Sequence, residues 1–360
     1  MEQTSVNFGK HRKYYLGKES KSLYDDIPVQ SPAIKISNSH PNGSQKRDAD
    51  LADLPCPKGD NSARMKPSTR YKLRGYYKER QGEREEMQDA HVLMDDFTKE
   101  FSTLDASIYR LALYAVFDGH AGSRASRFAS QNLHKILTDR FPKGDIKTVE
   151  KDIKKILIET FKKTDDDFLK QASRSKPAWK DGTTATVILA INDILYISSL
   201  GDSQAFLCRY KEEIKKCSAI HLTTVHNPSV YEERIRIQKA GGHVQDGRVM
   251  GTLEVSRSIG DGSYKNHGVS CVPDVKKCQL TDQDKYIVLA CDGLWKTFEP
   301  DDCINFTNKI LEDETLQGTD NKSTDDLRYE TACSRLANEA VLRLSADNVT
   351  VILISIQPNK

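Results

Sequence analysis

The distribution of apolar and polar residues divides this chain of 360 residues into two parts. Residues 1–70 are rich in Ser, Lys, Asn, Asp and Pro and have no sustained apolar periodicity. Such a segment lacks the apolar surface whose burial offsets the entropy lost on ordering. From residue 71 to residue 356, short apolar runs alternate with amphipathic stretches. The pattern predicts a flexible or disordered N-terminal tail over 1–70 and one folded unit over 71–356.

Short apolar runs within the folded unit predict buried strands, and apolar stripes at helical spacing predict helices. The predicted strands are 111–117, 186–191, 195–199, 286–290 and 349–356. The helical stripes are Ala125, Phe128, Ala129, Leu133, Ile136 and Leu137, and then Val149, Ile153, Ile156, Leu157, Phe161 and Phe168. A third helix is expected over 228–240, because Gly241 and Gly242 are a typical stop. The polar residues 313–326 predict a surface loop.

Two of the apolar runs, 194–200 and 204–208, are separated only by Gly201, Asp202 and Ser203. A connection this short is typical of a β-hairpin, so we expect the two runs to pair as antiparallel strands. Antiparallel strands combined with helices make the predicted class α+β.

Composition excludes several classes of protein. Apolar residues make up 37% of the chain, charged residues 29%, and the formal net charge is +2, which excludes a collagenous or wholly disordered chain. No run approaches the roughly 20 apolar residues of a membrane helix, and the first residues lack the apolar core of a secretory signal. We therefore expect an intracellular protein that does not enter a membrane. The near-neutral charge also argues against a nucleic-acid binder.

The eight cysteines do not form a recognisable metal or disulfide pattern. Cys208, Cys271, Cys291 and Cys333 lie within or beside apolar runs and have no CxxC spacing, so we predict reduced, mostly buried thiols. None of the eight has an arginine six residues further on. The spacing of a cysteine-based phosphatase is therefore absent.

Acidic residues recur at the ends of the predicted strands. A single Asp-Gly pair such as 118/119 or 292/293 is most often a plain turn. Here, however, Asp118, Asp202 and Asp292 each follow a buried strand, and Asp347 precedes another. If these strand ends converge, the carboxylates repel one another and take up protons unless cations neutralise them. The recurrence therefore predicts a metal site.

The chemistry of such a site follows from its oxygen donors. Carboxylates suit hard ions such as Mg²⁺ or Mn²⁺, whereas zinc usually recruits His or Cys. Gly119 has no Cβ and so allows its carbonyl to turn toward an ion. Two ions about 4 Å apart would bridge a water, lower its pKa and direct it at phosphorus. We therefore predict hydrolysis of a phosphate ester.

Two further residues suit the remaining steps of such a hydrolysis. His120 follows the first Asp-Gly pair, where it could protonate a departing alkoxide; a lone histidine is more often structural, so its adjacency to Asp118 carries the hypothesis. Arg84 could hold phosphate oxygens with its two-pronged guanidinium. The alternative for Arg84 is an exposed charge run with ordinary ion pairs.

Over residues 71–356 the sequence resembles the metal-dependent protein phosphatases of type 2C. The blocks that carry the resemblance occur in the family's order. They are Arg84-Glu85-Glu86-Met87-Gln88-Asp89, Phe117-Asp118-Gly119-His120, Gly182-Thr183-Thr184-Ala185, Leu200-Gly201-Asp202-Ser203, Glu254-Val255-Ser256-Arg257-Ser258-Ile259-Gly260-Asp261, Ala290-Cys291-Asp292-Gly293 and Ser345-Ala346-Asp347-Asn348-Val349-Thr350.

The resemblance implies a four-layer α-β-β-α sandwich, in which helices flank two central antiparallel sheets and a metal cleft lies at one end. It implies a serine/threonine protein phosphatase with two ions, Mg²⁺ or Mn²⁺, in a catalytic domain over 71–356. The roles it implies are metal ligation by Asp118, Asp292, Asp347 and the Gly119 carbonyl, phosphate binding by Arg84, acid catalysis by His120, and support from Asp89. Residues 226–264 would form a flap beside the cleft.

Three residues depart from the family's pattern. Gln88 replaces a common Glu and makes one contact near the metal waters neutral. Ala121 replaces a second Gly, which we expect to be tolerated at a helix start. Lys296 replaces an Asp that, with Asp202 and Asp292, would bind a third ion, and a cation there opposes that ion.

The alternative function is a pseudophosphatase scaffold that binds phosphoproteins without turnover. The expected partners are phosphoprotein substrates and a protein kinase, with a monomeric chain and a role in kinase signalling. The basic segment 10–18 is either a nuclear-import or docking element or a solvated charge run. We accordingly expect a cytoplasmic protein that also enters the nucleus if the first hypothesis holds.

Overall fold

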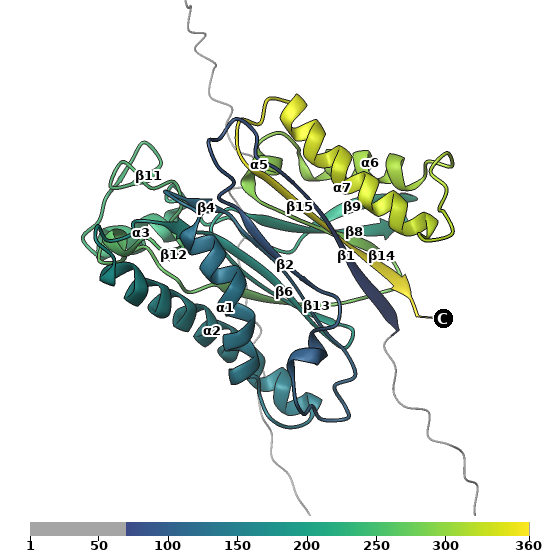
Figure 1. Cartoon of the computed structure of the whole chain (residues 1–360), viewed down its shortest axis with the longest axis horizontal. Coiled ribbons are helices and arrows are strands. Elements are labelled where there is room, and N and C mark those ends of the chain that lie inside the picture. The colour runs from purple at the N-terminus through teal and green to yellow at the C-terminus, as the bar shows by residue number, and fades with distance from the viewer. Residues whose placement is uncertain (1–69, 360) are drawn as a thin grey trace, which may run out of the picture. The chain divides into compact units, whose positions relative to one another are not determined.

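Two five-stranded antiparallel sheets lie face to face in the computed structural model, which describes residues 70–359 (Figure 1). The order of strands in the first sheet is β1 (Tyr71–Arg80), β15 (Val349–Pro358), β14 (Asp284–Ala290), β8 (Gln204–Lys211) and β9 (Lys216–His221). In the second it is β13 (Asp274–Gln279), β7 (Ile194–Leu200), β6 (Ala185–Ile191), β3 (Leu111–Phe117) and β2 (Ala90–Met94). The predicted tail over 1–70, apart from Arg70, and its basic segment 10–18 lie outside the described residues.

Helices cover the outer face of each sheet (Figure 1). The helices α1 (Arg124–Arg140) and α2 (Ile146–Arg174) pack on the second sheet, where Leu133 and Leu157 share an apolar core with Leu113. The helices α6 (Pro300–Leu311) and α7 (Thr324–Leu342) pack on the first sheet in the same way. A third apolar core fills the space between the sheets. The predicted four-layer α-β-β-α architecture is therefore confirmed.

Smaller elements gather at one end of the sandwich (Figure 1). They are a three-stranded sheet of β12 (Ile259–Gly260), β5 (Gly182–Thr183) and β4 (Gly119–His120), the pair β10 (Val244–Gln245) and β11 (Arg248–Val249), and the helices α3 (Tyr231–Lys239), α4 (Gly262–Lys265) and α5 (Asp292–Trp295). The single 3₁₀ turn among the described elements, η1, spans Phe97–Glu100. Residues 226–264 thus build a substructure of their own, with a small apolar core around Ile237 and Val249.

The prediction that 194–200 and 204–208 form a hairpin is wrong. The strand β7 pairs with β6 and β13, whereas β8 pairs with β14 and β9 in the other sheet. Leu195 and Ile197 instead meet Ala205 and Leu207 across the core between the sheets. The strands β7 and β8 lie in different sheets because both have apolar faces, which are buried when the two sheets pack face to face. The short connection at Asp202 therefore crosses from one sheet to the other.

The other predicted elements are present with shifted ends. The five predicted strands correspond to β3, β6, β7, β14 and β15, and the three predicted helices to α1, α2 and α3. The loop predicted over 313–326 is shorter, because α7 begins at Thr324, with the Ser323 hydroxyl accepting from the Asp326 amide at 3.1 Å. Cys271 is partly exposed, contrary to the prediction of a buried thiol, while Cys208, Cys291 and Cys333 are buried and free. Within residues 70–359, no helix is both long and apolar enough to cross a membrane.

Candidate active site

A cleft of about 590 Å³ opens at the end of the sandwich where β3, β7 and β14 end. Its walls include Asp118, Asp202, Asp292 and Asp347, all four of the acidic residues predicted to converge. Residues of the 226–264 segment, among them Arg248 and Tyr264, also line the cleft. The family resemblance implied that this segment lies beside the cleft, and the structure has it there.

Three of the carboxylates form a tight cluster. Asp118, Asp202 and Asp292 each offer an oxygen, and these oxygens all lie within 4.8 Å of one another. They come from three strands in two different sheets, and the sheet crossing at Gly201, where φ is +93°, delivers Asp202. The Asp292 amide also donates a hydrogen bond to Asp118 Oδ2 at 3.4 Å. The strand ends therefore converge, which is the condition on which the predicted metal site depends.

Burial and mutual repulsion raise the pKa values of this cluster. Burial is the main cause, and neighbouring carboxylates add to it: the pKa of Asp118 rises well above its ordinary value, and that of Asp202 rises to about 7. The pKa of Asp292 is raised less, because Lys296 opposes the effect of burial. Three partly buried acids that resist ionisation in one place need a positive charge to be fully ionised at neutral pH.

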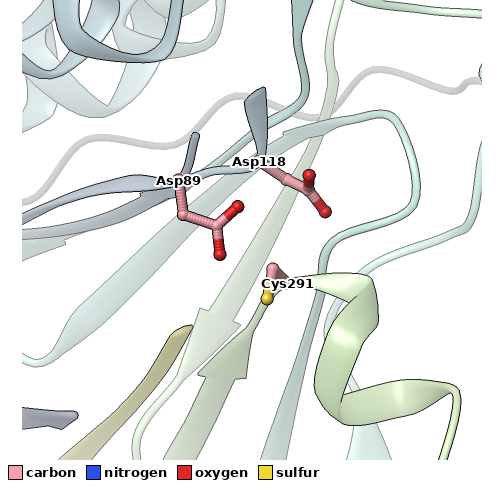
Figure 2. Close-up of side chains that lie close together, drawn as sticks. All are labelled: Asp89, Asp118 and Cys291. Carbon is pink, nitrogen blue, oxygen red and sulfur yellow. The ribbon is translucent and has the colours of Figure 1, made fainter. Parts of the chain in front are cut away.

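A second small cluster lies deeper and shares Asp118. Asp89, Asp118 and Cys291 lie side by side at the start of β2 and the ends of β3 and β14 (Figure 2). Asp89 accepts a hydrogen bond from Thr350 Oγ1 at 2.7 Å, and burial raises its pKa to about 7. The Cys291 sulfur accepts from the Thr350 amide at 3.1 Å, and burial raises its pKa well above the ordinary value. Thr350 thus positions both side chains, and the thiol stays protonated.

Lysine and arginine neutralise the outer edge of the cleft. Lys296 Nζ lies 2.6 Å from Asp292 Oδ2 and 2.8 Å from Asp347 Oδ2. Arg84 Nη2 also contacts Asp347, at 2.9 Å, while 57% of the arginine side chain remains exposed to solvent. Burial raises the pKa of Asp347, but these two cations outweigh it and the pKa falls. Asp347 is therefore ionised already, unlike the inner cluster.

His120 is held by a residue that the sequence analysis did not single out. Its Nε2 lies 2.7 Å from Oδ2 of Asp261, a carboxylate that is 2% exposed. Burial lowers the pKa of His120, but the Asp261 charge outweighs burial and the pKa is raised. The only sequence signal for Asp261 was its place in the block 254–261.

Packing and backbone conformation explain which residues suit the positions next to Asp118 and Asp89. A side chain at Gly119 would collide with the Gln88 carbonyl, so glycine is required there for a close approach of backbones. The Gln88 side chain donates to Glu86 at 2.9 Å. Ala121 has a φ of +56°, in the left-handed region, and α1 begins only at Arg124. The expectation that Ala121 lies at a helix start is therefore wrong, and the position suits glycine better.

The donor set of the cleft fits divalent cations of the hard type. Asp118, Asp202 and Asp292 offer oxygen ligands within reach of one another, whereas the nearest sulfur, Cys291, is protonated. Buried carboxylates with raised pKa values become fully ionised when a cation binds them. Mg²⁺ and Mn²⁺ are the ions that such donors prefer.

A comparison with known protein families identifies the family of this chain. The model of protein phosphatase 2C matches residues 74–349, which is more than half of the chain. The chain belongs to the protein phosphatase 2C family. It is accordingly a metal-dependent serine/threonine protein phosphatase, a hydrolase that acts on phosphoproteins, as the sequence blocks implied.

Individual relatives agree with the family. The chain is 60% identical over 284 residues to the human integrin-linked kinase-associated serine/threonine phosphatase 2C, covering 79% of this chain and 72% of the relative. It is 34% identical over 290 residues to the probable protein phosphatase 2C 8 of Arabidopsis thaliana, covering 77% and 76%. The solved serine-threonine phosphatase 2C of Toxoplasma gondii shares the fold, with a TM-score of 0.61, 19% identity and coverage of 79% and 95%.

Proposed function

We propose that this phosphatase hydrolyses phosphoserine and phosphothreonine esters of other proteins with the aid of two divalent cations, Mg²⁺ or Mn²⁺. When bound, two such ions would supply charge neutralisation and an activated water for attack on phosphorus. The observation that carries the proposal is the set of oxygens of Asp118, Asp202 and Asp292 within 4.8 Å of one another. When ionised, these three carboxylates carry more negative charge than is offset by Lys296, which is the one cation ion-paired to them in the part of the chain that the structure describes.

The role proposed for each residue rests on the position of its side chain or carbonyl group in the cleft. Asp118, Asp292, Asp347 and the Gly119 carbonyl would hold the ions, and Asp89, bonded to Thr350, would fix the inner end of the cluster. Arg84 is exposed at the mouth of the cleft and would bind phosphate oxygens. His120 would donate a proton to the departing alkoxide.

Lys296 bears on the number of ions. Its ammonium lies against Asp292 and Asp347, on the side where Asp202 and Asp292 would take a third ion. A fixed positive charge there repels a further cation. We therefore propose two ions per chain and no third ion at Asp202.

The wider role is proposed from the relatives. One relative is named as associated with integrin-linked kinase, and by that similarity we propose that this chain regulates kinase signalling and has a protein kinase among its partners. We further propose a monomer that works in the cytoplasm, and in the nucleus if the segment 10–18 acts in import.

Hydrolysis of a phosphothreonine peptide tests the proposal. We expect turnover with Mn²⁺ that a chelator abolishes and that Asp118→Asn lowers by more than about 10³-fold. Asp326→Asn is the matched control, because Asp326 of α7 accepts a hydrogen bond from the Tyr76 hydroxyl of β1 and does not line the cleft. An absence of turnover with every divalent ion would refute the proposal and favour the pseudophosphatase scaffold.

A further inference from the structure

Asp261 has no part in the chemistry described so far, although it contacts the proposed acid. It follows β12, and its backbone is fixed on two sides: its amide donates to the Asp181 carbonyl at 3.0 Å, and its carbonyl accepts from the Tyr264 amide at 2.8 Å. Its φ is +52°, a conformation that Asp and Asn adopt more readily than most residues. The carboxylate is thereby held rigidly beside His120.

The contact between Asp261 and His120 passes over Gly182. In the three-stranded sheet, Gly182 of β5 lies between His120 of β4 and Gly260 of β12. A Cβ on Gly182 would collide with both Asp261 Oδ2 and His120 Nε2. The backbone of Gly182 does not itself require glycine, because its φ lies outside the left-handed region. The glycine is therefore needed for this contact.

The contact also decides which nitrogen of His120 is available to a substrate. Nε2 is engaged by Asp261, and among the described residues Nδ1 has no hydrogen-bond partner. His120 lines the cleft together with Asp118 and Asp202. The ring orientation that satisfies Asp261 therefore leaves Nδ1 as the nitrogen free to serve the cleft.

We propose that Asp261 is a positioning residue for the hydrolysis: it accepts the Nε2 proton of His120 and so presents Nδ1 as the proton donor to the leaving oxygen. This inference rests on the proposed role of His120 as the acid. A carboxylate that fixes the tautomer and orientation of a catalytic histidine is a general device of enzymes. In this protein the carboxylate is that of Asp261, which belongs to the 226–264 segment. The position of that segment therefore affects the orientation of His120.

The proton balance of the step is complete. The bond from phosphorus to the seryl or threonyl oxygen breaks while a bond from phosphorus to a water oxygen forms. The Nδ1 proton moves to the leaving oxygen and gives the alcohol, and the imidazole keeps the proton on Nε2, held by Asp261. The attacking water gives up one proton, which restores the charge on His120 through solvent, and phosphate leaves.

The test compares substrates that differ in their need for an acid. A phosphothreonine peptide releases a strongly basic alkoxide, whereas p-nitrophenyl phosphate releases a stable phenolate that needs no proton. For Asp261→Asn we expect kcat on the peptide to fall about 10²-fold and kcat on p-nitrophenyl phosphate to fall less than about threefold. Asparagine keeps the shape and tolerates the left-handed backbone, so we expect the fold to persist.

Asp165→Asn is the matched control. Asp165 is also a buried carboxylate bound to β12, since it accepts from the Gly260 amide at 2.7 Å and pairs with Lys265 at 3.1 Å, but it does not contact His120. We expect this variant to lose thermal stability and to keep the wild-type ratio of the two activities. A change of that ratio equal to that of Asp261→Asn would overturn the inference.

A parallel variant, His120→Gln, separates the two levels of the proposal. If it loses peptide activity selectively but Asp261→Asn does not, the inference about Asp261 falls and the acid role stands. If His120→Gln loses both activities equally, the acid role falls and the inference with it. If the wild-type chain with Mn²⁺ hydrolyses neither substrate, the proposed function itself fails.

A spectroscopic readout covers the case in which Asp261→Asn does not fold. The ¹⁵N shifts of His120 in the wild-type protein, recorded while the ring is neutral, should report the tautomer protonated at Nε2. The tautomer protonated at Nδ1 would contradict donation of the Nε2 proton to Asp261.

Discussion

Two acidic sites in this phosphatase, the partly buried cluster of the cleft and the buried Glu233, differ in their supply of cations. In the cleft, Asp118, Asp202 and Asp292 crowd together, and Lys296 is the only cation of residues 70–359 that forms an ion pair with them. Within the 226–264 segment, Glu233 of α3 accepts from Arg236 at 2.6 Å and from Arg257 at 2.7 Å. Arg257 continues to Asp274 at 2.9 Å on β13, so this network anchors the segment to the second sheet.

The pKa values move in opposite directions for this reason. Burial raises the pKa of Glu233, but Arg257, Arg236 and Ser256 outweigh it and the pKa falls to about 2. In the cleft, burial and like charges act together, and the pKa of Asp202 rises to about 7. A buried acid that is fully paired serves the fold, whereas a group left short of cations is prepared to bind them.

Breaking the paired network should have the largest effect on stability. Glu233→Gln leaves Arg257 and Arg236, both partly buried, without their common carboxylate partner, and we expect a loss of about 3 kcal/mol in the free energy of unfolding. The difference should vanish in acid: the folded pKa is lowered, so the contribution is present above the ordinary pKa of 4.5 and is lost as pH falls toward 2. Urea unfolding at several pH values measures it, and equal stability of the two proteins at neutral pH would contradict it.

Removing an acidic group from the cleft should instead stabilise the metal-free protein. Without metal, Asp118→Asn relieves repulsion and should unfold at a higher temperature than the wild-type protein. In the wild-type protein, Mn²⁺ at a hundred times its Kd should add about 2.7 kcal/mol of stability, and the variant should lose most of this gain. Calorimetry with and without a chelator measures both. Undiminished stabilisation by Mn²⁺ in the variant would show that the ion binds elsewhere.

The stability of the metal-free protein should fall as the cleft ionises. The folded pKa of Asp202 is raised, so its contribution is complete below 3.8 and is lost as pH rises through about 7. Because neighbouring carboxylates share protons, we expect a fall of about 2 kcal/mol over this range. Chemical unfolding in chelator should record it, and saturating Mn²⁺ should abolish it. Stability that rises steadily from pH 5 to 8 in chelator would exclude this account.

Lys296 supplies one positive charge to the cleft and so reduces the difference between the cleft cluster and the Glu233 network. Its ammonium competes with metal for Asp292 and Asp347, so Lys296→Gln should bind Mn²⁺ about tenfold more tightly, as measured by titration calorimetry. The variant should also take up any third ion more readily, which the stoichiometry would show. Lys277→Gln is a suitable control, because Lys277 pairs with Glu150 away from the cleft. Weaker binding in Lys296→Gln would show that the lysine supports the metals.

The smallest effect should come from the backbone beside His120. Ala121 has a left-handed conformation that costs an L-residue roughly 1–2 kcal/mol, so Ala121→Gly should raise the free energy of unfolding by about 0.5–1 kcal/mol. The same change inside α1, Ala125→Gly, should lower it by about 1 kcal/mol. Thermal unfolding of both variants, with opposite signs, measures the difference. A loss of stability in Ala121→Gly would mean that the side chain contributes more than the strain costs.

The sequence predicted the buried strands well because their apolar runs are continuous. The strands β3 and β14 are buried along most of their length, and no other element type suits such short runs. The long edge strand β1 was missed, since its alternating pattern is weak and β15 pairs along its whole length. The pairing of β7 was predicted wrongly, because a short connection carries no information on whether two strands share a sheet.

The candidate site was predicted as a list of residue types but not as a set of contacts. Asp118, Asp202, Asp292 and Asp347 stood out by their recurrence at strand ends. Asp261 did not, because it follows a strand of two residues, β12, with little apolar signal. Its partner, His120, is 141 residues away in the chain. A contact that crosses a third strand at Gly182 leaves no periodic trace in the sequence.

By itself the sequence determined the class of fold, the family and the acidic residues of the cleft, because local apolar patterns and short motifs are written in consecutive residues. The tertiary structure decided which of the acids remain short of cations, which side of His120 is held, and how β7 and β8 face each other. These depend on distances between residues far apart in the chain, and such distances are set only when the two sheets and the 226–264 segment pack together.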